Sequence, residues 1–161
     1  MSLQIGSKAP NFSLPDTDKN TVTLESLKGQ NVVLFFFPFA FTGVCTKEMC
    51  SVRDDWSFYT NIKAKVFGIS VDSLFTLGKF KELNNVPFQL LSDFNKEACT
   101  AYDNLVPEWG TNGYKGVARR STFLIDKEGV LRYMEQLPTP GDFPNLERLK
   151  EELTKLETAV A

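Results

Sequence analysis

The stretch "NVVLFFFPFAFTGVCTKEMC", residues 31–50, decides how this chain folds. Residues 31–37 form a continuous apolar run that ends at Pro38, which is the pattern of a strand buried on both faces. Pro38 stops the strand because it has no backbone N–H to donate, and Thr42-Gly43 supply a turn. We therefore expect a buried strand followed by a helix whose first turn contains Cys45.

The segments on either side alternate between strand-like and helix-like patterns. Before the stretch, residues 12–24 predict a hairpin with a polar turn around Asp16–Asn20. After it, the patterns predict a helix with Val52, Trp56 and Tyr59 at helical spacing, a buried strand over 65–71, and a helix with Leu74, Leu77, Phe80 and Leu83 on one side. A short strand over 88–93 and a helix over about 95–103 follow. The chain then continues with an antiparallel hairpin of 121–126 and 130–135 and an amphipathic final helix with Leu146, Leu149, Leu153 and Leu156.

This order of elements predicts the fold class. It favours an α/β protein with a mixed central β-sheet flanked by helices and with an N-terminal β-hairpin. A thioredoxin-like fold satisfies the order best. The chain of 161 residues shows no repeats, low-complexity tracts or linkers, so we expect a single domain over 1–161.

Composition and charge limit the binding partners and the cellular location that can be expected. The net charge of −2 gives no electrostatic reason to expect binding to nucleic acid or to a membrane surface. The longest apolar run, Val32–Phe41, is too short to cross a bilayer. The first residues lack the basic region and apolar run of an export signal, so we expect a cytoplasmic protein.

The chain contains no histidine, which excludes Ser-His-Asp and Cys-His catalysis and histidine-based zinc sites. Three cysteines are too few, and odd in number, for a secreted disulfide framework. Their spacing fits no zinc pattern, and no cofactor is expected. What remains is thiol chemistry without an imidazole base, or cysteines that pack in the core.

Cys45 has the local setting of a reactive thiol. The free backbone N–H groups and the positive end of a helix dipole favour a thiolate in the first helical turn. An unperturbed thiol, with a pKa near 8.5, is only about 3% ionised at neutral pH, so full ionisation gives roughly 30-fold more nucleophile. The alternative is a buried cysteine that acts as a small hydrophobe. The turn, the Thr42 hydroxyl and the helix start together favour reactivity.

These residues resemble those of a known family. Pro38, Thr42 and Cys45 match the P-x-x-x-T-x-x-C signature of peroxiredoxins. The segments "GSKAPNFSLPD", "GISVDS", "LLSD" and "RSTFLID" are similar to peroxiredoxin segments in peroxiredoxin order. The spacing of Cys45 and Cys50 further resembles the bacterioferritin comigratory protein branch, in which both cysteines lie on one helix.

The resemblance implies a thiol-dependent peroxidase of antioxidant defence that reduces hydrogen peroxide and organic hydroperoxides. Cys45 would be the peroxidatic cysteine, Thr42 would hydrogen-bond its thiolate and the peroxide oxygen, and Pro38 would shield the site from water. Arg120 would stabilise the thiolate and the charge developing across the O–O bond. Arg119 stays an alternative, because a slip of one residue turns a side chain to the other sheet face.

Two further residues complete the implied site. Glu48 occupies the position at which several peroxiredoxins keep a glutamate near the arginine, although an exposed helical residue fits the pattern equally well. Cys50 would be the resolving cysteine. On an ideal helix, residues five apart lie about 8.6 Å apart at Cα, whereas a disulfide needs about 4.4–6.8 Å. A disulfide between Cys45 and Cys50 therefore requires local unwinding. Cys99 has no motif around it and is expected in the core.

The expected partners are a hydroperoxide and a thioredoxin-like or other dithiol reductant, with the protein a monomer or a homodimer. Three alternatives stay open. In the first, Cys50 only packs and an external thiol resolves a one-cysteine peroxiredoxin. In the second, the protein is a thioredoxin-like disulfide reductase, against which the missing C-x-x-C counts. In the third, it has a non-enzymatic role with an unactivated Cys45.

Overall fold

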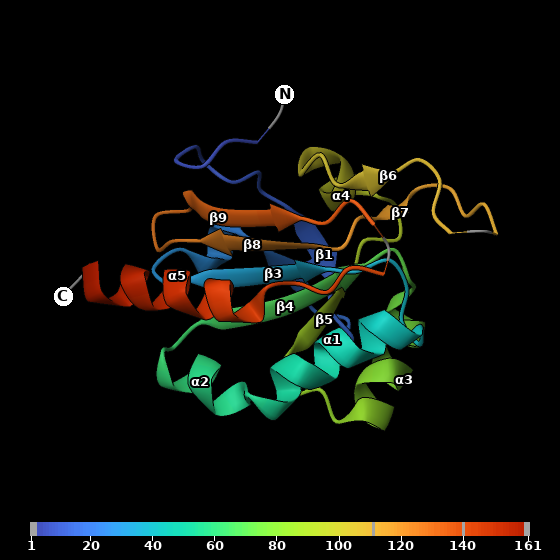
Figure 1. Cartoon of the computed structure of the whole chain (residues 1–161), viewed down its shortest axis with the longest axis horizontal. Helices are drawn as coiled ribbons and strands as arrows, with labels where there is room; N and C mark the ends of the chain where they lie inside the picture. The colour runs from blue at the N-terminus through green and yellow to red at the C-terminus, as the bar shows by residue number, and fades with distance from the viewer. Residues whose placement is uncertain (1–2, 111, 140, 160–161) are drawn as a thin grey trace.

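A five-stranded sheet forms the centre of the computed structural model, which describes residues 3–110, 112–139 and 141–159 (Figure 1). Its strands lie in the order β5-β4-β3-β8-β9. β5, β4 and β3 are parallel to one another, β8 runs antiparallel to β3, and β9 runs antiparallel to β8, so the predicted mixed sheet is confirmed. The strands are β3 (Val32–Phe36), β4 (Lys65–Ser70), β5 (Gln89–Ser92), β8 (Ser121–Ile125) and β9 (Leu131–Gln136).

Both faces of this sheet are covered, which explains the unbroken apolar run of β3. Alternate residues of a strand point to opposite faces. Val33 and Phe35 accordingly belong to one core cluster, whereas Val32 and Leu34 belong to the other. The first cluster is covered by α1 (Gly43–Asp54), α2 (Trp56–Asn61), α3 (Leu74–Asn84) and α5 (Leu146–Ala159). The second is covered by α4 (Glu97–Ala101) and the N-terminal hairpin of β1 (Ser13–Pro15) and β2 (Thr21–Thr23).

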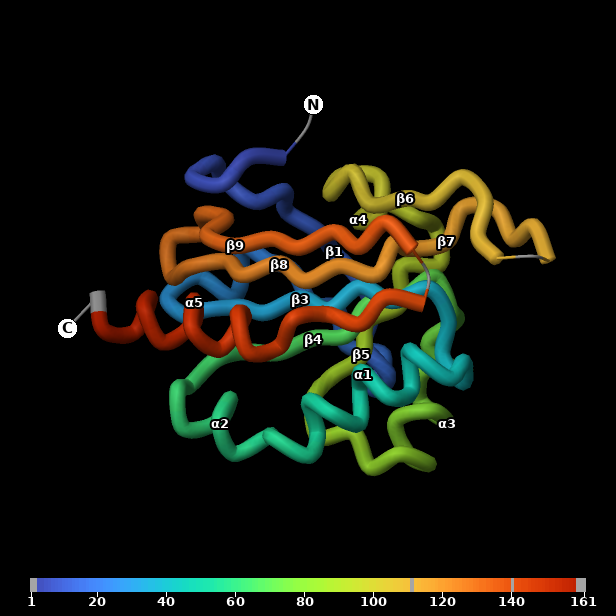
Figure 2. The backbone as a smooth tube through the Cα atoms, viewed as in Figure 1, coloured from blue at the N-terminus to red at the C-terminus, as the bar shows by residue number. Residues whose placement is uncertain are grey.

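The predicted hairpins and the final helix are confirmed. β1 pairs antiparallel with β2 around a turn in which the Asp16 carboxylate accepts from the N–H groups of Asp18 and Asn20. β8 and β9 form the second antiparallel pair. A short 3₁₀ helix, η1 (Glu25–Leu27), follows the first hairpin. The backbone trace in Figure 2 shows α5 running along the sheet face beside β3.

The helix expected through Val52 and Tyr59 is in fact two helices. α1 ends at Asp54 and α2 begins at Trp56. Asp55, between them, has φ −111° and ψ 24°, and its carboxylate forms an ion pair with Lys150 of α5. Aspartate is disfavoured in helix interiors because its side chain competes for the hydrogen bonds of the backbone. The ion pair joins the break to α5, which lies far along the sequence.

One predicted helix face was wrong at its end. Leu77 and Phe80 are fully buried, but Leu83 is 59% exposed. Steps of three residues drift by about 60° on a helix of 3.6 residues per turn, so Leu83 lies opposite Leu74 after three steps. The sequence patterns also missed a small antiparallel ladder, β6 (Leu105–Val106) with β7 (Val117–Ala118).

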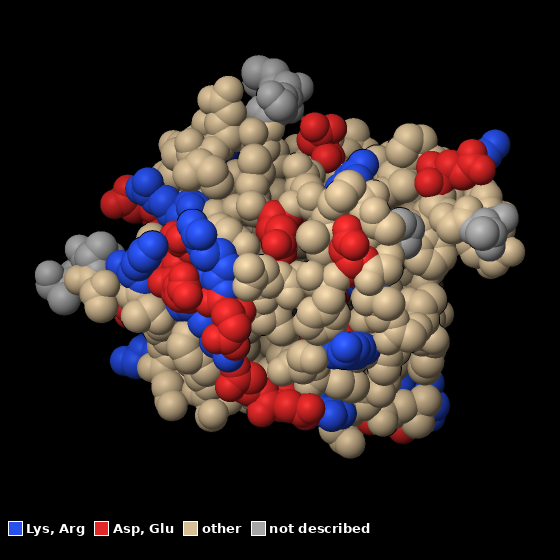
Figure 3. Space-filling model, in the orientation of Figure 1, with Lys and Arg blue, Asp and Glu red and all other residues tan. Residues whose placement is uncertain are grey.

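Charges on the surface are mixed in sign. On the face shown in Figure 3, basic and acidic side chains lie side by side over α5. They form ion pairs along the helix, including Arg148–Glu152 and Lys155–Glu152. Within the described ranges, no helix combines the length and the apolar character that crossing a membrane demands.

Candidate active site

The turn between β3 and α1 brings Cys45 to the carboxyl end of the central strand. Pro38 is buried two residues after the end of β3, and α1 begins at Gly43 with Thr42 in an extended N-cap conformation, φ −86° and ψ 156°. Cys45 is therefore the third residue of the helix, as predicted, and it is fully buried. The first N–H groups of a helix have no partner within the helix, so this position favours negative charge.

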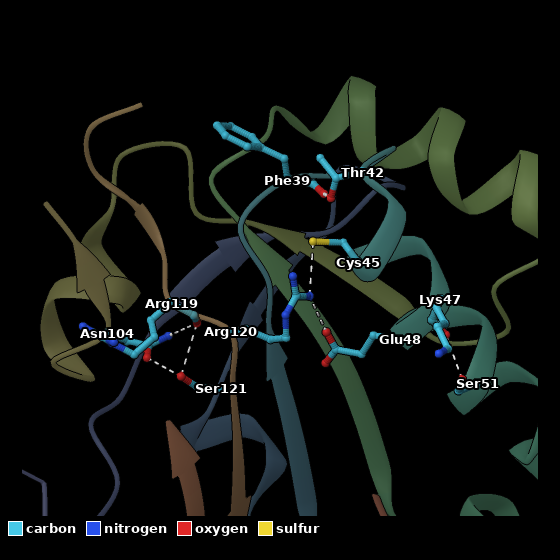
Figure 4. A network of polar contacts seen from close by, with 10 residues as sticks. All are labelled: Phe39, Thr42, Cys45, Lys47, Glu48, Ser51, Asn104, Arg119, Arg120 and Ser121. Carbon is cyan, nitrogen blue, oxygen red and sulfur yellow. Dashed lines mark hydrogen bonds and ion pairs between the residues drawn. The ribbon is translucent and has the colours of Figure 1, made fainter. Parts of the chain in front are cut away.

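The Thr42 hydroxyl faces back into the turn. It donates to the carbonyl oxygen of Phe39 at 2.9 Å. Because this contact uses the hydroxyl proton, the oxygen keeps lone pairs that can accept a further hydrogen bond. Figure 4 shows Thr42 beside Cys45, above the Arg120 side chain.

Arg120 connects this helix to β8. One guanidinium nitrogen, Nη1, donates to Cys45 Sγ at 3.2 Å and to Glu48 Oε1 at 2.9 Å (Figure 4). All three side chains are buried. Arg120 lies 75 residues after Cys45 and 72 residues after Glu48 in the sequence. The structure therefore places Arg120 and Glu48, together with Cys45, in one buried cluster.

Arg119, the neighbouring candidate, lies on the other side of the chain. Its Nη1 donates to the carbonyl oxygen of Leu137 at 3.4 Å, and its backbone pairs with Asn104. Figure 4 shows the Arg119 side chain directed away from Cys45. The register expected from "RRSTFLID" is thus the one that the structure has.

In this cluster the Arg120 guanidinium contacts two acidic groups, the Cys45 thiol and the Glu48 carboxyl. Burial raises the pKa of the Glu48 carboxyl from 4.5 to about 7, although the Arg120 charge and its hydrogen bond act in the opposite direction. Burial would lower the pKa of Arg120, but the adjacent sulfur and carboxyl outweigh it and raise that pKa. Near neutral pH, Glu48 is therefore poised between its neutral form and a carboxylate that competes for the guanidinium.

Cys50 lies further along the same continuous helix. It is half-buried, and its thiol approaches Asn84 Oδ1 of α3 at 3.8 Å. Arg53, one turn later, donates to the Asn84 carbonyl oxygen at 2.7 Å. Over the ranges that the structure describes, all three cysteines are free thiols. Cys45 and Cys50 thus occupy an intact helix, in which residues five apart lie too far apart for a disulfide.

Cys99 is a core residue, as expected. It is fully buried in the second cluster, and its backbone N–H donates to the Asp93 carboxylate at 2.8 Å. Burial, and then the Asp93 charge, raise the pKa of the Cys99 thiol. A thiol held neutral in this way is a poor nucleophile.

Sequence reasoning missed the residues that hold the turn before α1. The Asp72 carboxylate accepts from the Ala40 N–H at 2.8 Å, and Phe41 has a positive φ of 70°. Asp72 lies within the "GISVDS" segment, but its partner is 32 residues away and no spacing rule connects the two. The Phe39 carbonyl, which accepts from Thr42, leaves no trace in the sequence because every residue has such a group.

Comparisons with known proteins agree with this geometry. A model described as the AhpC/TSA family matches residues 5–134. The chain is 44% identical over 133 residues to the putative peroxiredoxin bcp of Coxiella burnetii, covering 81% of this chain and 87% of that protein. It is 42% identical over 133 residues to peroxiredoxin Bcp of Bacillus subtilis, covering 81% and 83%.

Two solved structures match the fold. Peroxidoxin BcpB from Mycobacterium tuberculosis superposes with a TM-score of 0.80 and 28% identity, covering 97% of both chains. A peroxiredoxin-like protein from Aquifex aeolicus gives a TM-score of 0.87 and 25% identity, covering 97% of this chain and 89% of that one.

Proposed function

The chain belongs to the AhpC/TSA family, in the bacterioferritin comigratory protein branch of the peroxiredoxins, and is a thiol peroxidase; we propose that Cys45 is its peroxidatic cysteine and Cys50 its resolving cysteine. The observation that carries this proposal is the contact of 3.2 Å between Cys45 Sγ and Arg120 Nη1 in the first turn of α1. A guanidinium and a helix N-terminus act together there on one buried sulfur.

In the first step, the Cys45 thiolate attacks the terminal oxygen of a hydroperoxide. The O–O bond breaks, the sulfur takes the terminal oxygen as sulfenic acid, and the other oxygen leaves as water or alcohol after protonation. Negative charge moves from the sulfur to the departing oxygen. Arg120 can follow that charge, because its guanidinium offers several N–H groups in a fixed plane.

Thr42 and Pro38 are assigned supporting roles. With its proton directed to Phe39, the Thr42 oxygen would accept a hydrogen bond from the hydroperoxide O–H and orient it for attack. The buried Pro38 ring would keep water from the sulfur. Exclusion of water strengthens the electrostatic contact with Arg120.

In the second step, the Cys50 thiolate attacks the sulfur of the Cys45 sulfenic acid. A disulfide forms and hydroxide leaves, to be protonated to water. A thioredoxin-like dithiol would then reduce the disulfide by exchange and return both thiols. Because the cytoplasm keeps thiols reduced, that compartment suits the cycle.

Peroxide consumption by four proteins tests the proposal, with dithiothreitol as reductant. We expect Cys45→Ser to abolish turnover while the protein stays folded, since serine is nearly isosteric but far less nucleophilic. With peroxide alone and no dithiothreitol, Cys50→Ser should consume the first equivalent at nearly the wild-type rate and then accumulate sulfenic or sulfinic acid on Cys45, because no small thiol is present to resolve it. Cys99→Ser is the matched control and should turn over normally. Substantial turnover by Cys45→Ser would assign the nucleophile elsewhere.

A further inference from the structure

The turn that leads into α1 contains an unfavourable backbone conformation. Phe41 has φ 70°, in the left-handed region. This region costs a residue with a bulky side chain, so it persists only where surrounding contacts enforce it. The Phe41 ring is 51% exposed and meets Phe80 of α3 edge-on, with 5.3 Å between the ring centroids. A half-exposed ring contact is weak compensation, so a stronger contact has to hold this turn.

Asp72 supplies such a contact. Its Oδ2 atom accepts from the Ala40 N–H at 2.8 Å, one residue before Phe41. A hydrogen bond from a backbone N–H to a carboxylate is among the stronger kinds in proteins. Ala40 is buried, so its N–H would lose its partner without this carboxylate.

Asp72 is itself fixed to the sheet. The hydroxyl of Ser70, the last residue of β4, donates to Asp72 Oδ2 at 2.7 Å. The hydroxyl of Ser92, the last residue of β5, donates to the Asp72 carbonyl oxygen at 2.6 Å. The Asp72 carboxylate is thus fixed by the end of β4 and the Asp72 backbone by the end of β5, and the carboxylate in turn binds the turn before α1.

We propose that Asp72 is a positioning residue that holds the strained 38–42 turn and thereby keeps Cys45 in place for the peroxide step. The inference rests on the proposed function and extends it to a residue that touches neither peroxide nor sulfur. The same hydrogen bond resists the unwinding that must precede a Cys45–Cys50 disulfide. Loss of Asp72 therefore slows the first step and speeds the second.

The first test measures the turn without any peroxide chemistry. Amide hydrogen exchange of the 38–50 segment is followed in the reduced protein. Asp72→Ala should exchange about tenfold faster in this segment than the wild type, since one charge-assisted hydrogen bond is lost. Asp72→Asn keeps the shape and a neutral acceptor and should fall between the two.

Asp126→Ala is the matched control. Like Asp72, Asp126 accepts hydrogen bonds from backbone N–H groups, those of Glu128 and Val130, but it lies in the β8–β9 turn. This variant should lower overall stability and leave the relative protection of the 38–50 segment unchanged. Equal exchange of that segment in Asp72→Ala and the wild type would overturn the inference.

The strain at Phe41 allows a second, independent test by hydrogen exchange. Phe41→Gly and Phe41→Ala both lose the ring contact with Phe80, but only glycine accepts φ 70° without strain. In the Asp72→Ala background, glycine should therefore slow exchange of the 38–50 segment about fivefold relative to alanine. Equal exchange of the two double variants would show that strain in the turn is not what Asp72 opposes.

Stopped-flow kinetics then connect the turn to the reaction. In Asp72→Ala, the second-order rate of sulfenic acid formation should fall about tenfold, whereas the later rate of disulfide formation should rise. General destabilisation, as in Asp126→Ala, would not move the two steps in opposite directions. If both steps slowed, the positioning role would be wrong. If the wild type consumed no peroxide, the proposed function would be wrong. The exchange measurements would still decide whether Asp72 holds the turn.

Discussion

At the residue scale, Arg120 is the group that joins the two buried acidic side chains of the proposed site. Its Nη1 atom serves both the Cys45 sulfur and the Glu48 carboxyl. Arg120→Lys keeps the charge but loses the planar set of donors that can bind two groups at once. We expect the second-order rate with peroxide to fall about a hundredfold, as for other lost transition-state donors.

The neighbouring arginine provides the control for this change. Arg119→Lys alters the same kind of side chain on the opposite side of the chain, where it contacts Leu137. Its rate with peroxide should stay close to that of the wild type. A larger loss in Arg119→Lys than in Arg120→Lys, measured by stopped-flow under single-turnover conditions, would contradict the assigned role of Arg120.

At the element scale, the proposed mechanism requires α1 to serve two incompatible purposes. Intact, it holds Cys45 against Arg120 and Cys50 against Asn84. Oxidation by one equivalent of peroxide should produce an intramolecular Cys45–Cys50 disulfide, and the first turns of α1 must unwind to form it. Far-UV circular dichroism should lose helical signal on oxidation and recover it with dithiothreitol.

Mass spectrometry of a non-reduced digest identifies the bond. Cys50→Ser is the control and should keep its helical signal after oxidation, because it cannot form this disulfide. A Cys45–Cys99 bond or an intersubunit bond in the oxidised wild type would rule out local unwinding of α1 as the resolving mechanism.

The packing of α1 on the sheet depends on the absence of a side chain at Gly68 of β4. A Cβ there would lie 2.6 Å from Leu90 Cδ2 and 3.2 Å from Met49 Sδ of α1. Gly68→Ala should therefore lower the free energy of unfolding by about 1–3 kcal/mol, measured by urea denaturation. Gly78→Ala, in α3, would meet only Thr17 Cβ at 3.8 Å and should stabilise by about 0.5–1 kcal/mol. Equal effects of the two variants would contradict this packing.

At the scale of the whole molecule, the buried Glu48 makes stability depend on pH. Its pKa is about 7 in the folded protein, raised first by burial, lowered by Arg120 and raised again by Glu135, against 4.5 ordinarily. The folded state thus holds the proton more tightly than the unfolded one. This contribution to stability is full below about pH 4.5 and is lost as pH rises through about 7, by a few kcal/mol at most.

Urea denaturation across this range measures the effect. The unfolding free energy of the wild type should fall more steeply between about pH 5 and 7 than that of Glu48→Gln, which cannot titrate. Parallel pH profiles of the two proteins would mean that the carboxyl keeps an ordinary pKa when buried.

Several features of this protein follow from the sequence alone, because they depend on residues adjacent in the chain. The apolar run before Pro38 specifies a strand with two buried faces. The Thr42-Gly43 turn starts the next helix, so that Cys45 lies in the first turn of this helix. The order of such segments was enough to predict the mixed sheet with helices on both faces. The signature of Pro38, Thr42 and Cys45 was enough for the family.

Contacts between segments far apart in the chain were decided only by the tertiary structure. Whether Glu48 is an exposed helical residue or a buried partner of Arg120 depends on how α1 sits against β8, 72 residues away. The ion pair between Asp55 and Lys150 of α5 and the hydrogen bond from the Ala40 N–H to Asp72 likewise join residues that are far apart in the chain. Local patterns contain none of this, because burial and pairing arise when the sheet brings these side chains together, and burial then raises the pKa of Glu48.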